Sequence, residues 1–159
     1  MKPFNNKKKQ NFLSNIPQTS IESDTDKLTK RCKFNFHYMD FSQGQNFTDW
    51  QPKLSKLLDK LKNYSGESLN YWRKERIGKK GHVLEVYKNF PSKSKFKHPK
   101  FVPHEAHWAR FRLEWNDRLI GFVLPSEYSE KKHHKTKIQF DCNTFYIVFL
   151  DENHDFYKT

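Results

Sequence analysis

Apolar residues recur with helical spacing between residues 48 and 64, in the order Trp50, Leu54, Leu57, Leu58, Leu61 and Tyr64. Residues three and four apart share one face of a helix, so this pattern predicts an amphipathic helix. Thr48 or Asp49 can cap its start, and Pro52 is tolerated in its first turn. A shorter helix is expected over residues 69–75.

Other parts of the chain alternate between apolar and polar residues, as half-buried strands do. Strands are predicted at residues 33–41, 82–87, 108–115, 118–124, 137–140 and 144–150. The last of these is apolar throughout, as in a central strand buried on both faces. The element order predicts an α+β fold in which the N-terminal strand and two helices pack on one face of a mainly antiparallel sheet of four or five strands. The other face would then be free to carry polar side chains.

The length of 159 residues suits one domain. Residues 1–30 are rich in Lys, Asn, Gln, Ser and Thr and are expected to form a flexible basic tail. Residues 31–159 then form a single α+β domain. Aromatic residues make up 16% of the chain, with 15 Phe, so a small core can be built from a few large side chains.

The formal charge is +12, from 30 Lys and Arg against 18 Asp and Glu. A charge of this size points to an acidic protein or a nucleic acid as partner, and nucleic acid is the commoner of the two. A membrane partner is not expected, since no apolar run is long enough to span a bilayer and no secretory signal begins the chain. A cytoplasmic protein is therefore expected, in which Cys32 and Cys142 are reduced thiols; the alternative is one disulfide between them.

Three arginines are expected to gather on one sheet face. Arg110 and Arg112 are two residues apart in a predicted strand and project together, about 7 Å apart. The hairpin that follows brings Arg118 close to them. Guanidiniums clustered in this way repel one another unless an anion lies among them, and phosphate accepts bidentate bonds from arginine. The same pattern also fits solvated arginines partly neutralised by Glu114 and Asp117.

The C-terminal residues offer a second set of candidate groups. His154 can donate a proton, Tyr157 can stack or form hydrogen bonds, and Lys158 beside it is a further candidate for RNA binding. Both rings also fit an ordinary surface position.

Cations and aromatics alternate between residues 95 and 101. This pattern suits the binding and stacking of single-stranded RNA, through Lys95, Lys97, His98 and Lys100. It equally fits a basic loop that is anchored in the core by Phe96 and Phe101.

No pattern predicts a metal or cofactor site. His104, Glu105 and His107, or the pair His133 and His134, can bind a metal adventitiously, but no Cys and His residues have zinc-finger spacing. A close acidic cluster, a glycine-rich phosphate loop and a serine-nucleophile motif are also absent from the sequence. Any RNA cleavage is therefore expected to proceed without a metal ion.

The run WARFRLEWNDRLIGFVL, the later TFYIVFL and the terminal HDFYK together resemble the second half of RelE/YoeB-type toxins. The strand–helix–helix order that precedes them fits the same fold. The resemblance covers roughly residues 33–158 and is most specific over 108–124 and 144–158. It implies a RelE-like fold and a metal-independent endoribonuclease that cuts mRNA, often on the ribosome, and is neutralised by an antitoxin protein.

The resemblance also implies residue roles. Arg110 and Arg112 match the basic pair that holds the scissile phosphate, and Arg118 matches the arginine that stabilises the phosphorane. His154 or Tyr157 matches the terminal acid/base or stacking group. The 2′-OH would attack the adjacent phosphate and give a cyclic phosphate and a 5′-OH.

This chain departs from the family pattern at the basic pair, which is often Lys, because Arg cannot act as a base. His98 lies roughly where some members place a glutamate base, and Glu105 is nearer the strand. Two other functions remain open. One is a non-catalytic RNA- or DNA-binding module, and the other is a ParE-like toxin that acts on a protein target.

Overall fold

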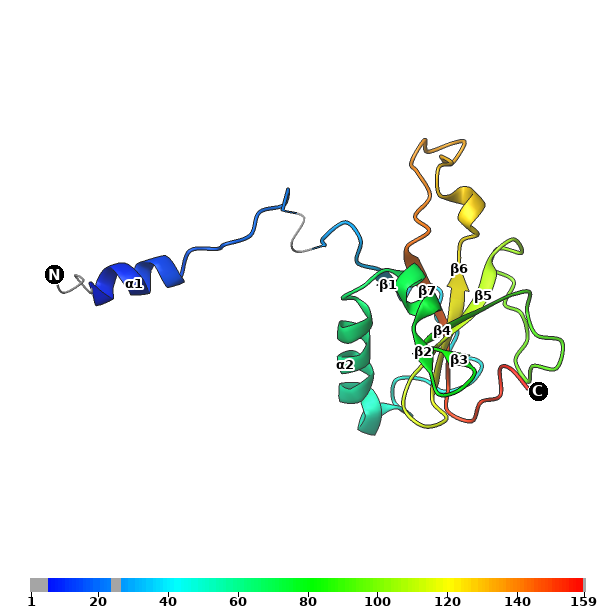
Figure 1. The fold of residues 1–159 in the computed structure, drawn as a ribbon. Coiled ribbons are helices and arrows are strands. Elements are labelled where there is room, and N and C mark those ends of the chain that lie inside the picture. Colours follow the sequence, from blue (N-terminus) through cyan, green and yellow to red (C-terminus); the bar gives the residue numbers. More distant parts are fainter. Residues whose placement is uncertain (1–5, 24–26, 159) are drawn as a thin grey trace.

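The computed structural model describes residues 6–23 and 27–158 and has an α+β fold (Figure 1). Its elements in chain order are α1 (Lys7–Ser14), β1 (Lys33–Asn35), the 3₁₀ turn η2 (Gln51–Lys53), α2 (Leu54–Tyr64), α3 (Leu69–Lys74), β2 (Arg76–Ile77), β3 (Gly81–His82), β4 (Leu84–Lys88), β5 (His107–Arg112), β6 (Arg118–Val123), the 3₁₀ turn η3 (Ser126–Tyr128) and β7 (Thr144–Asp151).

Five strands form the main sheet in the order β1-β7-β6-β5-β4. The strands pair antiparallel except for β1, which runs parallel to β7. The α+β class and the mainly antiparallel sheet are therefore confirmed. The small hairpin of β2 and β3 forms a separate two-stranded sheet that the sequence pattern did not predict.

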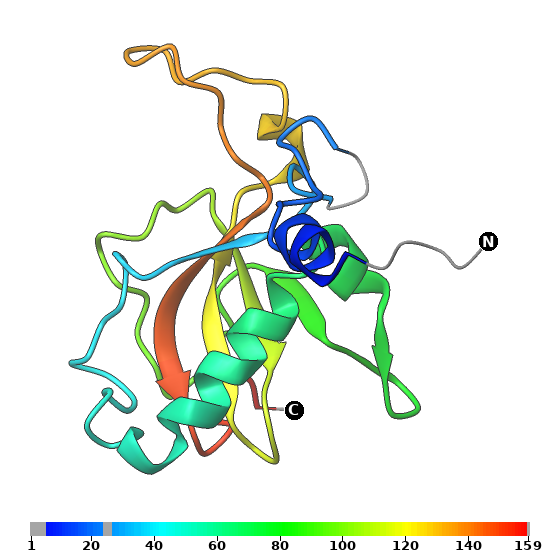
Figure 2. The ribbon, with the colours of Figure 1, turned by 90° about the vertical axis from the view of Figure 1, so that its left-hand side faces the viewer.

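The two helices α2 and α3 cover one face of this sheet (Figure 2). Leu57, Leu61 and Tyr64 of α2 are buried there, whereas Leu58, expected on the same stripe, is 60% exposed. The expected start at residues 48–50 is also wrong, because the chain forms a 3₁₀ turn through Pro52 before α2 begins. The side chains of Asp49 and Asn46 instead accept hydrogen bonds from each other's backbone N–H groups.

The strand predicted at residues 33–41 ends at Asn35. The Asn35 side chain accepts a hydrogen bond from the His37 backbone N–H, which turns the chain out of the sheet. Phe34 packs in the core beneath the helices, Phe36 is exposed, and Tyr38 packs against the opposite face. The predicted alternation over nine residues is therefore wrong beyond Asn35.

The sheet face opposite the helices is covered rather than free, which corrects the sequence-based expectation. A second core cluster fills it, built from Phe96, Val102, Ala106, Trp108, Ile120, Phe122, Val148, Phe149 and Phe156. The loop between β4 and β5 and the segment after β7 supply several of these residues. Phe156, for example, packs against Trp108 at a ring separation of 5.5 Å. The arginines therefore share this face with an aromatic layer.

The excursion between β6 and β7 contains no strand at residues 137–140, where one was predicted. A single bridge joins Lys132 to Gln139, and residues 129–140 form an exposed hairpin that projects from the sheet in Figure 1. Cys32 is a buried free thiol, and Cys142 is a half-buried one.

The predicted basic tail begins with a short helix. Asn6 caps α1, and none of the helix residues is buried. The end of the predicted tail contacts the domain, since Lys27 pairs with Glu67 at 2.9 Å and the Lys30 carbonyl accepts a bond from Asn143. Residues 1–5 and 24–26 lie outside the described residues.

Candidate functional site

Arg110, Arg112 and Arg118 lie on the same face of the sheet, opposite the helices. Phe111 is buried in the cluster beneath the helices, so its neighbours in β5 point the other way. Arg112 lies directly opposite Arg118 in the register of β5 and β6. The juxtaposition predicted from the sequence is thus confirmed.

A carboxylate lies at each side of this cluster, but both are engaged elsewhere. Asp151 faces Arg118 from β7 and accepts hydrogen bonds from three backbone N–H groups, those of Asn153, Asp155 and Phe156. Glu85 faces Arg110 from β4 and accepts a bond from the backbone of His82. In the described part of the chain no ion pair includes any of the three arginines.

Arg118 is the most enclosed of the three, with 4% of its surface exposed. Its Nη1 donates to the backbone carbonyls of Trp115 and Asp117, both at 2.8 Å, while its Nε has no acceptor. Burial, followed by the charges of Arg110 and Arg112, lowers the pKa of Arg118 to about 10. The side chain therefore stays charged at neutral pH and holds the β5–β6 turn, whereas Arg110 and Arg112 are only half-buried.

Arg110 has buried donors without acceptors. Its Nε and Nη1 are covered and have no hydrogen-bond partner, and neither has the hydroxyl of Tyr87. Burial raises the pKa of Tyr87 to about 12, and both the charge of Arg110 and the close approach of its side chain to the Tyr87 hydroxyl oppose this shift. An unsatisfied buried donor costs about 1–3 kcal/mol, more when it is charged, so these covered groups lower the stability of the fold at this site.

The C-terminal segment returns across this face and brings Tyr157 next to Tyr87. The Tyr157 ring stacks on Tyr87 with centroids 4.7 Å apart and an angle of 5°. These two rings, with Phe90 and Lys158, help to line a pocket of about 580 Å³. Tyr157 therefore contacts Tyr87, which is near Arg110, and no contact of Tyr157 itself with the arginines is found among the described residues.

His154 is placed less favourably. It lies half-buried in the turn after β7, with a left-handed backbone at φ +58°. Within the described residues no ring contact or hydrogen bond joins its side chain to the arginines.

The basic residues predicted to bind RNA divide into two groups. Lys95 and Lys158 both contact Asp155, at 2.8 and 3.6 Å, and the hydrogen bond from Lys95 is the main cause that lowers the pKa of Asp155. Lys97 is exposed, and its backbone exchanges two hydrogen bonds with the Gln43 side chain.

The other group consists of His98 and the nearby Lys100. The position of His98 is fixed by the residues around it. Its ring packs against Phe90 and Trp108, with Nδ1 2.8 Å from the Pro99 carbonyl, and Lys100 is exposed. Phe96 is buried in the second core cluster, so it anchors the loop and cannot stack on RNA. The alternating stretch is therefore a basic loop held by one of its two phenylalanines.

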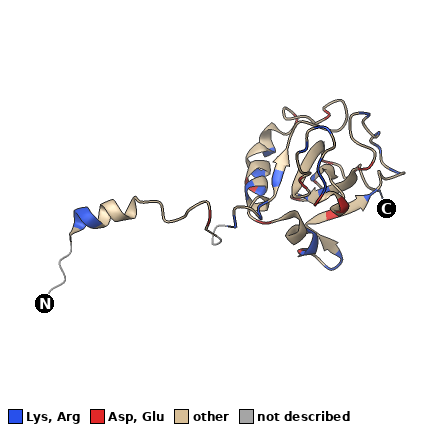
Figure 3. Cartoon of the chain, turned by 90° about the horizontal axis from the view of Figure 1, so that it is seen from above, with Lys and Arg blue, Asp and Glu red and all other residues tan. Residues whose placement is uncertain are grey.

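Lysine and arginine are spread over α1, α2 and the loops, with fewer acidic residues among them (Figure 3). Among residues 6–23 and 27–158, no group of three His, Cys, Asp or Glu side chains is placed to hold a metal ion. Within the same residues no helix has the length and apolarity needed to cross a bilayer.

Sequence reasoning missed Tyr87 and Asp151. Alternation in β4 carried the signal for Tyr87, because Leu84 and Val86 face the core beneath the helices while Glu85 and Tyr87 face the arginines. Asp151 carried a usable signal, because an acidic residue that ends an apolar strand before a polar turn is suited to bind the N–H groups of that turn.

Comparison with protein-family models, with curated proteins and with solved structures finds no match to this chain.

Proposed function

We propose that the protein binds RNA through Arg110, Arg112 and Arg118 and cleaves it without a metal ion. The observation that supports this most is the gathering of three like charges on one sheet face, where no ion pair among the described residues neutralises them. A phosphodiester supplies the negative charge that this cluster lacks. The resemblance to RelE/YoeB-type toxins extends the proposal to a RelE-like fold, an mRNA target in the cytoplasm, action on the ribosome, and an antitoxin partner.

In the proposed reaction, the 2′-OH of one nucleotide attacks the adjacent phosphorus as its proton passes to a base. The bond from phosphorus to the 5′ oxygen breaks, and that oxygen takes a proton from an acid. The products are a 2′,3′-cyclic phosphate and a 5′-OH. Arg110 and Arg112 hold the phosphate oxygens, and the buried Arg118 beside them adds positive electrostatic potential. His154 or Tyr157 serves as the proton-transfer group, since arginine cannot act as base.

A second candidate function is RNA binding without cleavage. It is favoured by the position of Arg118, whose Nη1 already bonds two backbone carbonyls. An arginine held in this way adds positive electrostatic potential to the site and stabilises the turn. Both effects would serve an RNA-binding protein as well as they serve an RNA-cleaving enzyme.

The test is cleavage of an end-labelled RNA by purified protein in EDTA. The proposal predicts cyclic-phosphate products from the wild type, none from a 2′-O-methyl copy of the RNA, and none from the Arg110→Gln/Arg112→Gln variant. The Arg76→Gln variant, which removes one exposed arginine from β2, serves as the matched control and should cleave normally. Binding of RNA with no product would support the second candidate, and failure to bind RNA would contradict both.

A further inference from the structure

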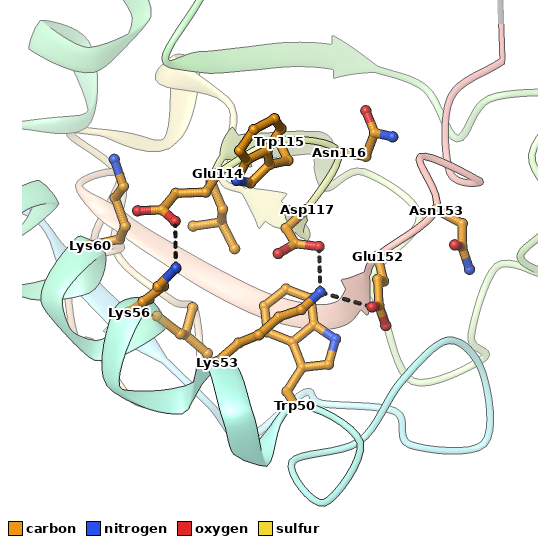
Figure 4. Close-up of a pocket in the computed structure, with 12 residues that line it drawn as sticks. Trp50, Lys53, Lys56, Lys60, Glu114, Trp115, Asn116, Asp117, Glu152 and Asn153 are labelled. Carbon is orange, nitrogen blue, oxygen red and sulfur yellow. Dashed lines mark hydrogen bonds and ion pairs between the residues drawn. The ribbon is translucent and has the colours of Figure 1, made fainter.

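A pocket of about 450 Å³ lies between α2 and the β5–β6 turn (Figure 4). The side chains of Lys53, Lys56 and Lys60 line it from the helical side, and residues 114–117 of the turn line it from the other side. Its volume is in the range of small-molecule sites. The predicted site residues take no part in its lining.

Trp115 lies at this pocket with 88% of its surface exposed. The other three tryptophans of the chain are buried. Trp115 also has a left-handed backbone with φ +52°, which is unfavourable for a bulky residue. A strained and exposed indole is retained at a cost in stability, and such costs concentrate at functional positions.

Charged side chains also line the pocket, and most of them are paired. Lys53 pairs with Asp117 and Glu152, and Lys56 pairs with Glu114. Lys60 has no ion pair among the described residues. Beneath them, the Nε1 of Trp50 is buried without an acceptor, in a residue that is 1% exposed. The pocket thus combines an exposed indole face with a cation outside these ion pairs.

We infer that this pocket is a nucleotide subsite for single-stranded RNA, in which a base stacks on Trp115 and its phosphate contacts Lys60. This inference rests on the proposed RNA-binding function and deepens it. An acidic peptide fits less well, because it offers no ring to stack on Trp115 and no amino or imino donors for Glu114, Asp117 and Glu152. The same three groups can accept hydrogen bonds from the amino and imino groups of a base.

The subsite is joined to the arginine cluster through Arg118. Its Nη1 bonds the carbonyl of Trp115, and this bond helps to hold the strained backbone that presents the indole. Arg112 of β5 and Arg118 of β6 are paired in the register, and no other residue pair of these two strands lies nearer to the turn. One RNA strand that passes around the turn would therefore contact both the arginines and Trp115.

The test is a titration of the full chain with a 2′-O-methyl oligouridylate, which cannot be cleaved. Because the other tryptophans are buried, stacking on Trp115 should quench the indole fluorescence, and the oligonucleotide should protect it from iodide. Affinity is measured in parallel with a dye-labelled copy of the oligonucleotide. Trp115→Ala should weaken binding by about fivefold to a hundredfold, the range expected for one stacked base. Trp115→Phe should restore most of the affinity. Lys60→Gln should lower the affinity and make it less dependent on salt concentration.

Tyr71→Ala is the matched control, since Tyr71 is a half-exposed ring on α3 outside the pocket, and it should bind as the wild type does. If the wild type binds and Arg110→Gln/Arg112→Gln weakens binding while Trp115→Ala does not, the subsite is wrong and the proposed function stands. If the wild type does not bind at all, the proposed function itself fails. Equal quenching by oligoglutamate would overturn the assignment of RNA to this pocket.

Discussion

The change Arg112→Gln removes one of two guanidiniums that face each other across β5 and β6. Like charges at directly opposed positions of a sheet destabilise it by up to about 1 kcal/mol. The backbone hydrogen bonds of Arg112 survive the substitution, since its N–H donates to Val83 and its carbonyl accepts from the hydroxyl of Tyr64. We therefore expect the free energy of unfolding to rise by about 0.5–1 kcal/mol. The melting temperature should rise by about 1–4 °C.

The same variant should respond less to anions. At a concentration ten times its dissociation constant, a ligand that binds only the folded state stabilises it by about 1.4 kcal/mol. Urea and thermal unfolding of the wild type, Arg112→Gln and Arg76→Gln are compared in sodium chloride and in inorganic phosphate at equal ionic strength. Phosphate should stabilise the wild type and Arg76→Gln more than Arg112→Gln.

Two results would refute this reasoning. A destabilisation of more than about 1 kcal/mol in Arg112→Gln would exceed the repulsion that the substitution relieves and would make Arg112 a structural residue. Equal stabilisation of all three proteins by phosphate would show a general salt effect and no anion site at the arginines.

Three further predictions concern other parts of the molecule. Asp151→Asn should lower the free energy of unfolding by about 2–3 kcal/mol, because the buried carboxylate accepts three N–H groups and faces Arg118. Urea unfolding measures this decrease, and hydrogen exchange should speed up at residues 153–156; unchanged exchange there would contradict it. At pH 8 a thiol reagent should modify Cys142 before Cys32, whose pKa burial raises to about 11, and peptide mapping shows the order. Because the pKa of Cys32 is raised in the folded state, the free energy of unfolding should fall above about pH 9, where this thiol ionises in the unfolded chain but not in the folded one. The exposed hairpin of residues 129–140 carries four lysines, Lys131, Lys132, Lys135 and Lys137. Their exchange for glutamine should reduce the slope of log affinity against log salt by about 0.7 for each RNA phosphate that the hairpin no longer binds. An unchanged slope would exclude the hairpin from the interface.

Local patterns predicted the elements whose burial follows a simple period. The spacing of apolar residues located α2, apart from its start and the exposed Leu58, and the continuous apolar run located β7. The gathering of the arginines followed from alternation in β5 and from the position of Arg118 at the start of β6. These features depend on residues close together in the chain, so the sequence is sufficient to reveal them.

Other features depend on distant residues or on single side chains. The covering of the second sheet face requires Phe96 and Phe156 to pack together from two loops, which no periodicity marks. The early end of β1 depends on one hydrogen bond to the Asn35 side chain. The left-handed backbone at Trp115 was not predictable either, because this conformation is expected of glycine or asparagine and not of tryptophan.

The central claim is that Arg110 and Arg112 bind RNA phosphates. The most direct test is the affinity of a 2′-O-methyl oligonucleotide for the wild type and for Arg110→Gln/Arg112→Gln across a range of salt concentrations, with Arg76→Gln as control. Each phosphate of single-stranded RNA that a basic side chain neutralises contributes about 0.7 to the slope of log affinity against log salt. The slope of the double variant should therefore be shallower by about 1.4, and its binding should be weaker. The same slope and affinity in the double variant and the wild type would contradict the claim.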